Sequence, residues 1–144
     1  MSITTVRMLM QVKGSDIWSI TPNATVYEAL SMMADKDVGA LLVTENDALV
    51  GIISERDYAR KVILLGKTSK ETLVSEIMTT VLYTIHPDQT IEECMELMTN
   101  RRIRHLPVVE TDQLLGVISI GDVVKAIIFQ QRQTIKDMEK YVTG

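Results

Sequence analysis

Two short motifs carry the groups best suited to holding a ligand: Gly51-Ile-Ile-Ser54-Glu-Arg-Asp57 and Gly116-Val-Ile-Ser119-Ile-Gly-Asp122. Each predicts a strand that runs into a helix start, so a hydroxyl and a carboxylate stand at one corner. Free amides at a helix start attract phosphate, a serine hydroxyl can donate to a phosphate oxygen, and a carboxylate one turn along can accept both hydroxyls of a ribose. The same Ser-x-x-Asp pattern is also an ordinary helix start, and both interpretations stay open.

These motifs end the two copies of an internal repeat. Residues 20–57 align with residues 85–122 at a constant shift, and 14 of the 38 positions are identical. Ordinary amino-acid frequencies would give roughly two or three identities. Each copy reads as β-α-β-β-α. Two copies predict one α/β module whose halves are related by a pseudo-twofold axis and share a cleft, where function should be sought.

Apolar runs and capping residues predict the strands and helices of each copy. Apolar runs predict strands at 17–20, 40–44 and 49–53, repeated at 105–109 and 114–118. Thr25 and Thr90, each followed three residues later by glutamate, predict capping boxes at helix starts. We expect a first repeat over 12–65, a linker over 66–73, a second repeat over 74–128 and a helical extension over 129–144.

The two ends of the chain carry further helical patterns. In the extension, a roughly heptad stripe runs through Val124, Ile128, Gln131, Ile135, Met138 and Val142, so the last helix should project from the module. Near the beginning, Val6, Leu9 and Val12 are in phase for a short helix or arm.

Composition excludes several classes of protein. The net charge of −4 argues against a nucleic-acid-binding surface, and no apolar run approaches the ~20 residues of a membrane span. The first residues lack a signal-peptide pattern, so a cytoplasmic location is the expectation. The single cysteine, Cys94, lies on an apolar helix face and is expected to be buried and inert. His86 has no supporting ligand trio in the sequence, so no metal site is expected.

The paired patterns, h-x-[ST]-h-x-P before a capped helix and G-h-h-[ST]-x-x-D after two strands, resemble a CBS domain, and two in tandem resemble a Bateman module over about residues 12–128. The stretches GIISERDYARKV and RIRHLPVV resemble small stand-alone bacterial CBS-pair proteins. The resemblance implies a disc-like regulatory module that binds an adenosine compound (AMP, ADP, ATP or NAD) between its repeats. It also implies a homodimer and leaves room for an unidentified regulated protein.

The resemblance also implies roles for individual residues. The motif aspartates would hold the ribose, the serines would contact ribose or phosphate, and the segments before each proline would contact the base. Arg104 and His105, where the first copy has Gly39 and Ala40, make the two half-sites chemically unequal and would contact phosphate. The candidate nucleotide-binding residues are Ser19, Thr21, Pro22, Gly39, Ala40, Ser54, Arg56, Asp57, Thr84, His86, Pro87, Arg104, His105, Ser119 and Asp122.

Catalysis is not expected, because no nucleophile or base is accompanied in sequence by an orienting partner. A second reading is a dimeric protein-interaction module with vestigial nucleotide clefts. The presence of both Asp57 and Asp122 argues against it, and melting with and without adenine nucleotides would distinguish the two.

Overall fold

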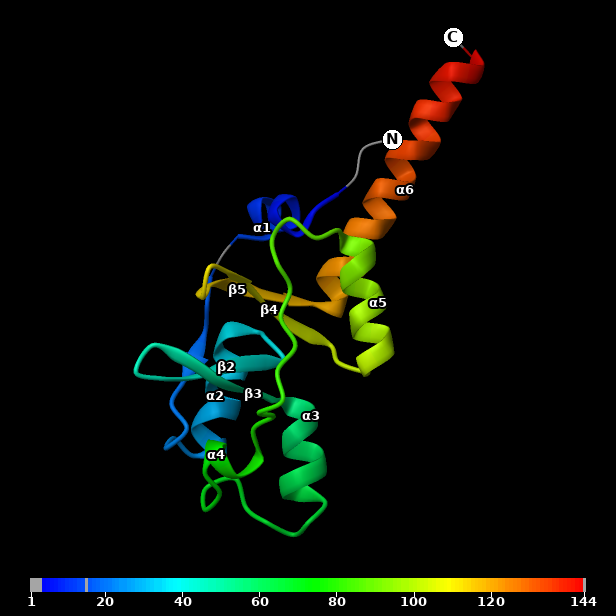
Figure 1. Ribbon diagram of the computed structural model, residues 1–144. Helices are drawn as coiled ribbons and strands as arrows, with labels where there is room; N and C mark the ends of the chain where they lie inside the picture. The colour runs from blue at the N-terminus through cyan, green and yellow to red at the C-terminus, as the bar shows by residue number, and fades with distance from the viewer. Residues whose placement is uncertain (1–3, 15, 144) are drawn as a thin grey trace. The chain divides into compact units, whose positions relative to one another are not determined.

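The computed structural model describes residues 4–14 and 16–143 and is drawn in Figure 1. The chain forms two compact units, each of which contains one of the expected repeats. One unit is Ile17–Leu82, and the other combines the residues before Ile17 with those from Tyr83 onward. Both units are mixed α/β, which confirms the fold class expected from the repeat.

The first unit has a three-stranded sheet. Its elements are β1 (Ser19–Ile20), α2 (Val26–Lys36), β2 (Ala40–Glu45), β3 (Ala48–Ser54), α3 (Glu55–Tyr58), a π-helical turn (Ala59–Ile63) and α4 (Val74–Ile77). The strand order is β1-β2-β3, with β1 parallel to β2 and β2 antiparallel to β3. Buried Val26 and Met33 of α2 pack in one core with Leu41 and Ile53 of the sheet.

The second unit repeats this plan with a smaller sheet. It contains α1 (Val6–Lys13), α5 (Ile91–Arg101), β4 (His105–Glu110), β5 (Gln113–Ser119) and α6 (Ile120–Thr143). Strands β4 and β5 form an antiparallel hairpin. The expected first strand of this repeat is reduced to one parallel bridge between Ile85 and Val108. Its core, which includes Ile91, Met98 and Ile118, is separate from that of the first unit.

Local sequence explains the paired helix ends. Thr90 accepts a hydrogen bond from the Glu93 amide (3.1 Å), and the Glu93 carboxylate accepts one from the Thr90 amide (3.2 Å), which completes the expected capping box. At Thr25 only the threonine half of the box forms, to the Glu28 amide (3.1 Å). The paired helices α2 and α5 both end at a left-handed residue, Asp37 or Arg102.

Helices α1 and α4 occupy equivalent positions, although each lies outside the aligned repeat. The amides of Val6 and Arg7 donate to the carbonyls of Gln89 (2.8 Å) and Pro87 (2.8 Å). In the same way, the amides of Val74 and Ser75 donate to the carbonyls of Ala24 (2.8 Å) and Pro22 (3.0 Å). Residues 74–77, expected at the start of the second repeat, therefore pack on the first, and the N-terminal helix packs on the second.

The linker segment is part of the same packing. Thr72 is buried, and its carbonyl accepts a hydrogen bond from the Val26 amide (2.8 Å). Leu73 forms an antiparallel bridge with Thr25. Residues 66–73 thus lead directly into the contacts that hold α4 against α2.

The motif glycines are explained by these two helices. A Cβ built on Gly51 would lie 2.8 Å from Sδ of Met78, which follows α4 directly. A Cβ on Gly116 would overlap Cε of Met10 in α1. Glycine at the start of each G-h-h-S-x-x-D motif therefore lets a methionine lie against the strand, because a side chain there would occupy the same space.

The last helix is long and largely exposed. Helix α6 has 24 residues, and Figure 1 shows it extending beyond α5 and the hairpin of its own unit. Val123 is buried in the core, whereas the expected stripe residues Ile135, Met138 and Val142 are exposed. Among the described residues, no helix is long and apolar enough to span a membrane. The expected N-terminal helix also forms, with Val6 and Leu9 buried and Val12 exposed.

Candidate nucleotide-binding site

The first Ser-x-x-Asp motif forms a complete capping box. The Asp57 amide donates to Ser54 Oγ (3.1 Å), and Asp57 Oδ2 accepts from the Ser54 amide (3.0 Å) and hydroxyl (3.1 Å). Ala40 pairs with Ser54 across the sheet, and the Gly39 carbonyl accepts from the Glu55 amide (3.1 Å). Four of the expected residues, Gly39, Ala40, Ser54 and Asp57, thus gather at this corner.

Both oxygens of the Asp57 carboxylate have partners. Besides the contacts to Oδ2, Oδ1 lies 3.2 Å from Nζ of Lys61 and accepts a long hydrogen bond (3.5 Å) from the hydroxyl of Thr79. The Lys61 ammonium also donates to the Ile77 carbonyl (3.0 Å). A ligand diol at Asp57 would have to share Oδ1 with these groups.

The second motif forms the same corner with a different cation. The Asp122 amide donates to Ser119 Oγ (3.2 Å), and Asp122 Oδ2 accepts from the Ser119 amide (2.8 Å). His105 pairs with Ser119, and the Arg104 carbonyl accepts from the Ile120 amide (2.9 Å). The expected residues Arg104, His105, Ser119 and Asp122 therefore lie together at the start of α6.

Lys13, at the end of α1, completes this second corner. Its Nζ lies 2.5 Å from Asp122 Oδ2 and donates to the Val117 carbonyl (2.6 Å). Burial by itself would raise the pKa of Asp122, but the Lys13 ammonium and the Ser119 amide outweigh it and hold that pKa below its ordinary value. The Lys13 ammonium and the Ser119 amide both donate to Oδ2 of Asp122.

The segments before the prolines lie elsewhere in each unit. In the first unit, Ser19 pairs with Leu42 and the chain runs parallel to β2, so Thr21 and Pro22 lie toward the hairpin turn. Ser54 pairs with Ala40, at the opposite end of β2. Ile85, which corresponds to Ile20, pairs with Val108 in the same way, so Thr84, His86 and Pro87 follow this pattern in the second unit. Within one unit, therefore, the base-contact segment and the Ser-x-x-Asp corner are not brought together.

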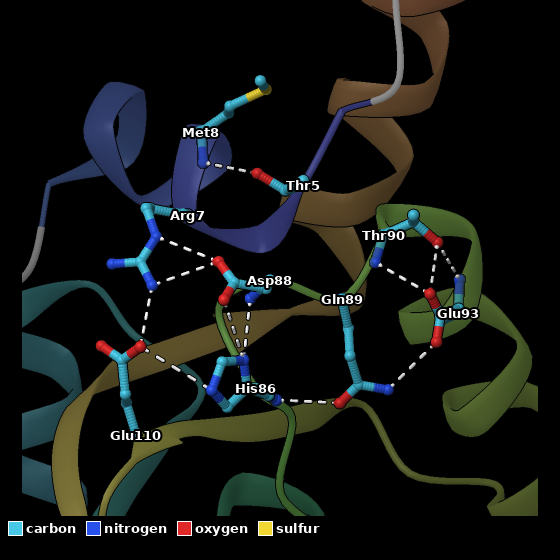
Figure 2. Close-up of polar contacts among 9 residues, drawn as sticks. All are labelled: Thr5, Arg7, Met8, His86, Asp88, Gln89, Thr90, Glu93 and Glu110. Atoms are coloured by element: carbon cyan, nitrogen blue, oxygen red, sulfur yellow. Dashed lines mark hydrogen bonds and ion pairs between the residues drawn. The ribbon is translucent and has the colours of Figure 1, made fainter.

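His86 is placed in a charged cluster, drawn in Figure 2. Nδ1 of His86 accepts a hydrogen bond from the Asp88 amide (3.0 Å), and Nε2 lies 3.7 Å from Glu110. Arg7 of α1 reaches both carboxylates, at 3.2 Å from Asp88 and 2.9 Å from Glu110, which raises the Arg7 pKa.

The ligand atoms of His86, Asp88 and Glu110 lie within 4.8 Å of one another, a grouping that residue spacing did not reveal. Arg7 already pairs with both carboxylates, and a metal on Nδ1 of His86 would replace the hydrogen bond that Nδ1 accepts from the Asp88 amide. The cluster is therefore best described as an ion-pair link that fastens α1 to its unit.

With this geometry in place, comparison with known proteins identifies the family. The CBS domain family matches residues 9–63 and 74–129. The chain belongs to the CBS-domain family. Its two units are a CBS pair, and CBS-domain proteins are regulatory modules.

Similar proteins support this membership over nearly the whole chain. A solved structure of a CBS-domain protein from Burkholderia ambifaria MC40-6 is 48% identical, with a TM-score of 0.86 over 89% of this chain and 96% of that one. CBS domain-containing protein CBSX3, mitochondrial, from Arabidopsis thaliana is 41% identical over 98% of this chain and 73% of its own length. The CBS pair of protein MJ0100, solved with 5′-methylthioadenosine and S-adenosyl-L-methionine, is 22% identical, with a TM-score of 0.78 over 90% of this chain and 99% of that one. This last likeness establishes the fold alone.

The remaining charged candidates of the CBS pair are exposed. Arg56 and Arg104 both lie on the surface, and among the described residues neither side chain makes a hydrogen bond or an ion pair. Both side chains are exposed to a ligand, and no partner from the described part of the chain holds them in position. The rings of Trp18 and Tyr83 lie under the Lys36 ammonium (4.4 Å) and the Arg101 guanidinium (5.0 Å) at the helix ends.

Cys94 of the CBS pair is buried and unpaired, as expected. Burial raises the pKa of its thiol to about 12, and the neighbouring carboxylates of Glu93 and Glu92 add to the effect. Because the thiolate is the reactive form, this cysteine is chemically inert in the folded protein.

Proposed function

We propose that this CBS pair is a non-catalytic regulatory module that binds an adenine nucleotide (AMP, ADP, ATP or NAD) between its repeats. Ligand binding would bias the arrangement of the repeats or of a homodimer, and so act on a regulated partner protein. The complexes of MJ0100 with two adenosine compounds support this class of ligand for the fold. A reducing compartment such as the cytoplasm suits a chain whose only thiol is Cys94.

The carboxylate of Asp122 is the observation that carries the proposal. It is partly buried, and the Lys13 ammonium and the Ser119 amide hold its pKa below the ordinary value, so the carboxylate is ionised at neutral pH. A ribose diol would supply two donors to such a group. The position also lies at the first turn of the long helix α6, where backbone amides favour a phosphate. The matching corner at Asp57 opens a shorter helical segment, Glu55–Tyr58 continued by Ala59–Ile63, so we expect the second corner to bind more tightly.

Matched substitutions test this proposal. Asp122→Asn retains a side-chain oxygen that can cap the helix but removes the charge, and Asp57→Asn is the same change at the other corner. Charge-assisted hydrogen bonds are worth about 1.5–3 kcal/mol each, so Asp122→Asn should weaken nucleotide binding by at least about ten-fold in calorimetry. Binding that is unchanged in both variants, with only melting lowered, would assign these aspartates to helix capping alone.

A second candidate function, a dimeric interaction module, is favoured by the exposed stripe on α6. The stripe residues follow an alternating four- and three-residue spacing and are all exposed: Val124, Ile128, Gln131, Ile135, Met138 and Val142. That spacing is the a/d seam of a coiled coil. We propose that it pairs with the same stripe of a second copy.

The stripe favours a parallel pair over an antiparallel one. In a parallel pair each residue faces its own copy, so Gln131 meets Gln131 and the two amides can hydrogen-bond. β-branched residues then occupy the a positions at Ile128 and Ile135, which favours two strands. In an antiparallel pair with the same layers, Gln131 would face Ile135, and two buried amides would lack partners.

Light scattering tests the dimer independently of the nucleotide. Ile135→Glu should convert a dimer to a monomer of 16.2 kDa, whereas Gln133→Glu, exposed on the opposite side of α6, should leave the dimer intact. Gln131→Leu should tighten association, because it replaces a polar layer with an apolar one. A wild-type mass of 16.2 kDa at micromolar concentration would refute the dimer.

A further inference from the structure

The two corners differ most in the cation that holds each aspartate. At Asp57 the cation is Lys61, four residues along the same helical segment. At Asp122 it is Lys13, which comes from the N-terminal helix, 109 residues away in sequence. The Lys13 and Asp122 side chains are only 32% and 24% exposed, so this ion pair is shielded from water more than a typical surface pair.

The first unit has a backbone pair at the position where Lys13 binds in the second unit. Ile52 and Thr79 exchange two hydrogen bonds, from the Thr79 amide to the Ile52 carbonyl (2.8 Å) and from the Ile52 amide to the Thr79 carbonyl (3.0 Å). Val117 corresponds to Ile52 in the repeat, and its carbonyl instead accepts from the Lys13 ammonium. The residue at the place of Lys13 after α4 is Val81, which is uncharged and exposed. At the second corner a side-chain ammonium on a flexible stem, that of Lys13, therefore takes the position that a backbone amide, that of Thr79, has at the first.

We propose that Lys13 sets the ligand class of the second corner, selecting phosphorylated adenosines over neutral or cationic adenosine compounds. The proposal rests on the nucleotide function proposed above. A ribose diol on Asp122 competes with Lys13 for the same carboxylate. The displaced ammonium, on a flexible stem, then needs another anion, and a phosphate on the same ribose supplies it.

Charge balance gives the direction of selection. Adenosine itself weakens the Lys13–Asp122 ion pair and offers Lys13 no new anion, so its net affinity is lowered by the cost of breaking that pair. A sulfonium compound such as S-adenosyl-L-methionine brings a positive centre toward the ammonium, which repels it. A nucleoside phosphate restores a partner to Lys13. The order of affinity should therefore be AMP, then adenosine, then S-adenosyl-L-methionine.

The test measures the affinity of AMP, adenosine and S-adenosyl-L-methionine by calorimetry for wild type, Lys13→Met and Lys13→Arg. Methionine keeps an unbranched stem without charge, and arginine keeps the charge. Lys13→Met should lose AMP affinity by at least ten-fold and leave adenosine affinity equal or higher, because Asp122 no longer has a competing cation. Lys13→Arg should retain the preference for AMP. Lys136→Met, an exposed charge removed from the outer part of α6, should leave the preference unchanged.

Two results would overturn the inference, and they are distinguishable from failure of the nucleotide function. If Lys13→Met weakens AMP and adenosine by the same factor, Lys13 only supports the fold of the corner. If wild type binds adenosine as tightly as AMP, the phosphate contributes nothing to affinity and Lys13 does not select for it. If wild type binds none of the three, the nucleotide function itself fails and the inference falls with it. Thermal unfolding in parallel establishes that each variant is folded.

Discussion

The ion pair between Lys13 and Asp122 should contribute measurably to stability, and the contribution should depend on pH. Lys13→Met removes two hydrogen bonds of the ammonium, to Asp122 (2.5 Å) and to the Val117 carbonyl (2.6 Å). Hydrogen bonds to charged groups contribute about 1.5–3 kcal/mol each when sheltered. Since both side chains are a quarter to a third exposed, water replaces part of each, and the expected total loss is about 2 kcal/mol at pH 7. For a chain of this size that lowers the melting temperature by about 4–8 °C.

The sign of the pH dependence follows from the pKa of Asp122. That pKa is lowered in the folded protein, so the ionised group stabilises the fold fully above its unfolded value of about 3.9 and loses this effect as pH falls through the folded value. Urea unfolding at pH 7 and near pH 3 should therefore show the Lys13→Met deficit shrinking in acid. The bond to Val117 persists, so the deficit should not vanish. A deficit equal at both pH values would refute the electrostatic reasoning and assign the loss to packing of the lysine stem.

Other perturbations test the packing. Gly51→Ala should cost about 1–3 kcal/mol in urea unfolding, because the new Cβ would lie 2.8 Å from Sδ of Met78 and 3.1 Å from the Thr79 carbonyl oxygen. Gly121→Ala, which meets only ordinary contacts, should be neutral or stabilising by up to about 1 kcal/mol, and equal losses in the two variants would contradict the close-approach argument. Thr90→Ala should cost about 1 kcal/mol by removing a helix cap, and no change would mean that the cap is replaced by water. Cys94 should resist iodoacetamide at pH 8 until the protein is unfolded, and rapid labelling of native protein would show that the thiol is accessible.

Local signals in the sequence were sufficient for the repeated body of each unit. Capping threonines and apolar runs act over a few residues, so they can be recognised without the fold. The capping role of the Ser-x-x-Asp motifs was one of two open interpretations, and the structure shows that it is real. The Ser119 amide and the Lys13 ammonium both donate to Oδ2 of Asp122, so the capping role and the proposed ligand role involve the same carboxylate.

The contacts of α1 and α4 could not be predicted from the aligned repeat. Val6 corresponds to Val74 in structure, a shift of 68, whereas the aligned repeats are shifted by 65. The segment from α1 to the first repeat is therefore longer than the segment from α4 to the second repeat. For this reason the sequence alignment of the repeats does not extend to these two helices. The equivalence depends on backbone hydrogen bonds and on Met10 and Met78 lying against glycines, which leave little trace in residue identity.

The pairing of helices with repeats connects the candidate site to the two segments that pass from one unit to the other. The boundaries between units fall after Asp16 and after Leu82. Lys13, which holds Asp122, lies three residues before the first boundary, and Thr79, which contacts Asp57, lies three residues before the second. A ligand that displaced Lys13 from Asp122, or Thr79 from Asp57, would therefore act on a residue just before a segment that crosses between the units. Under the proposed function, ligand binding at either corner would act through these crossing segments on the arrangement of the two units.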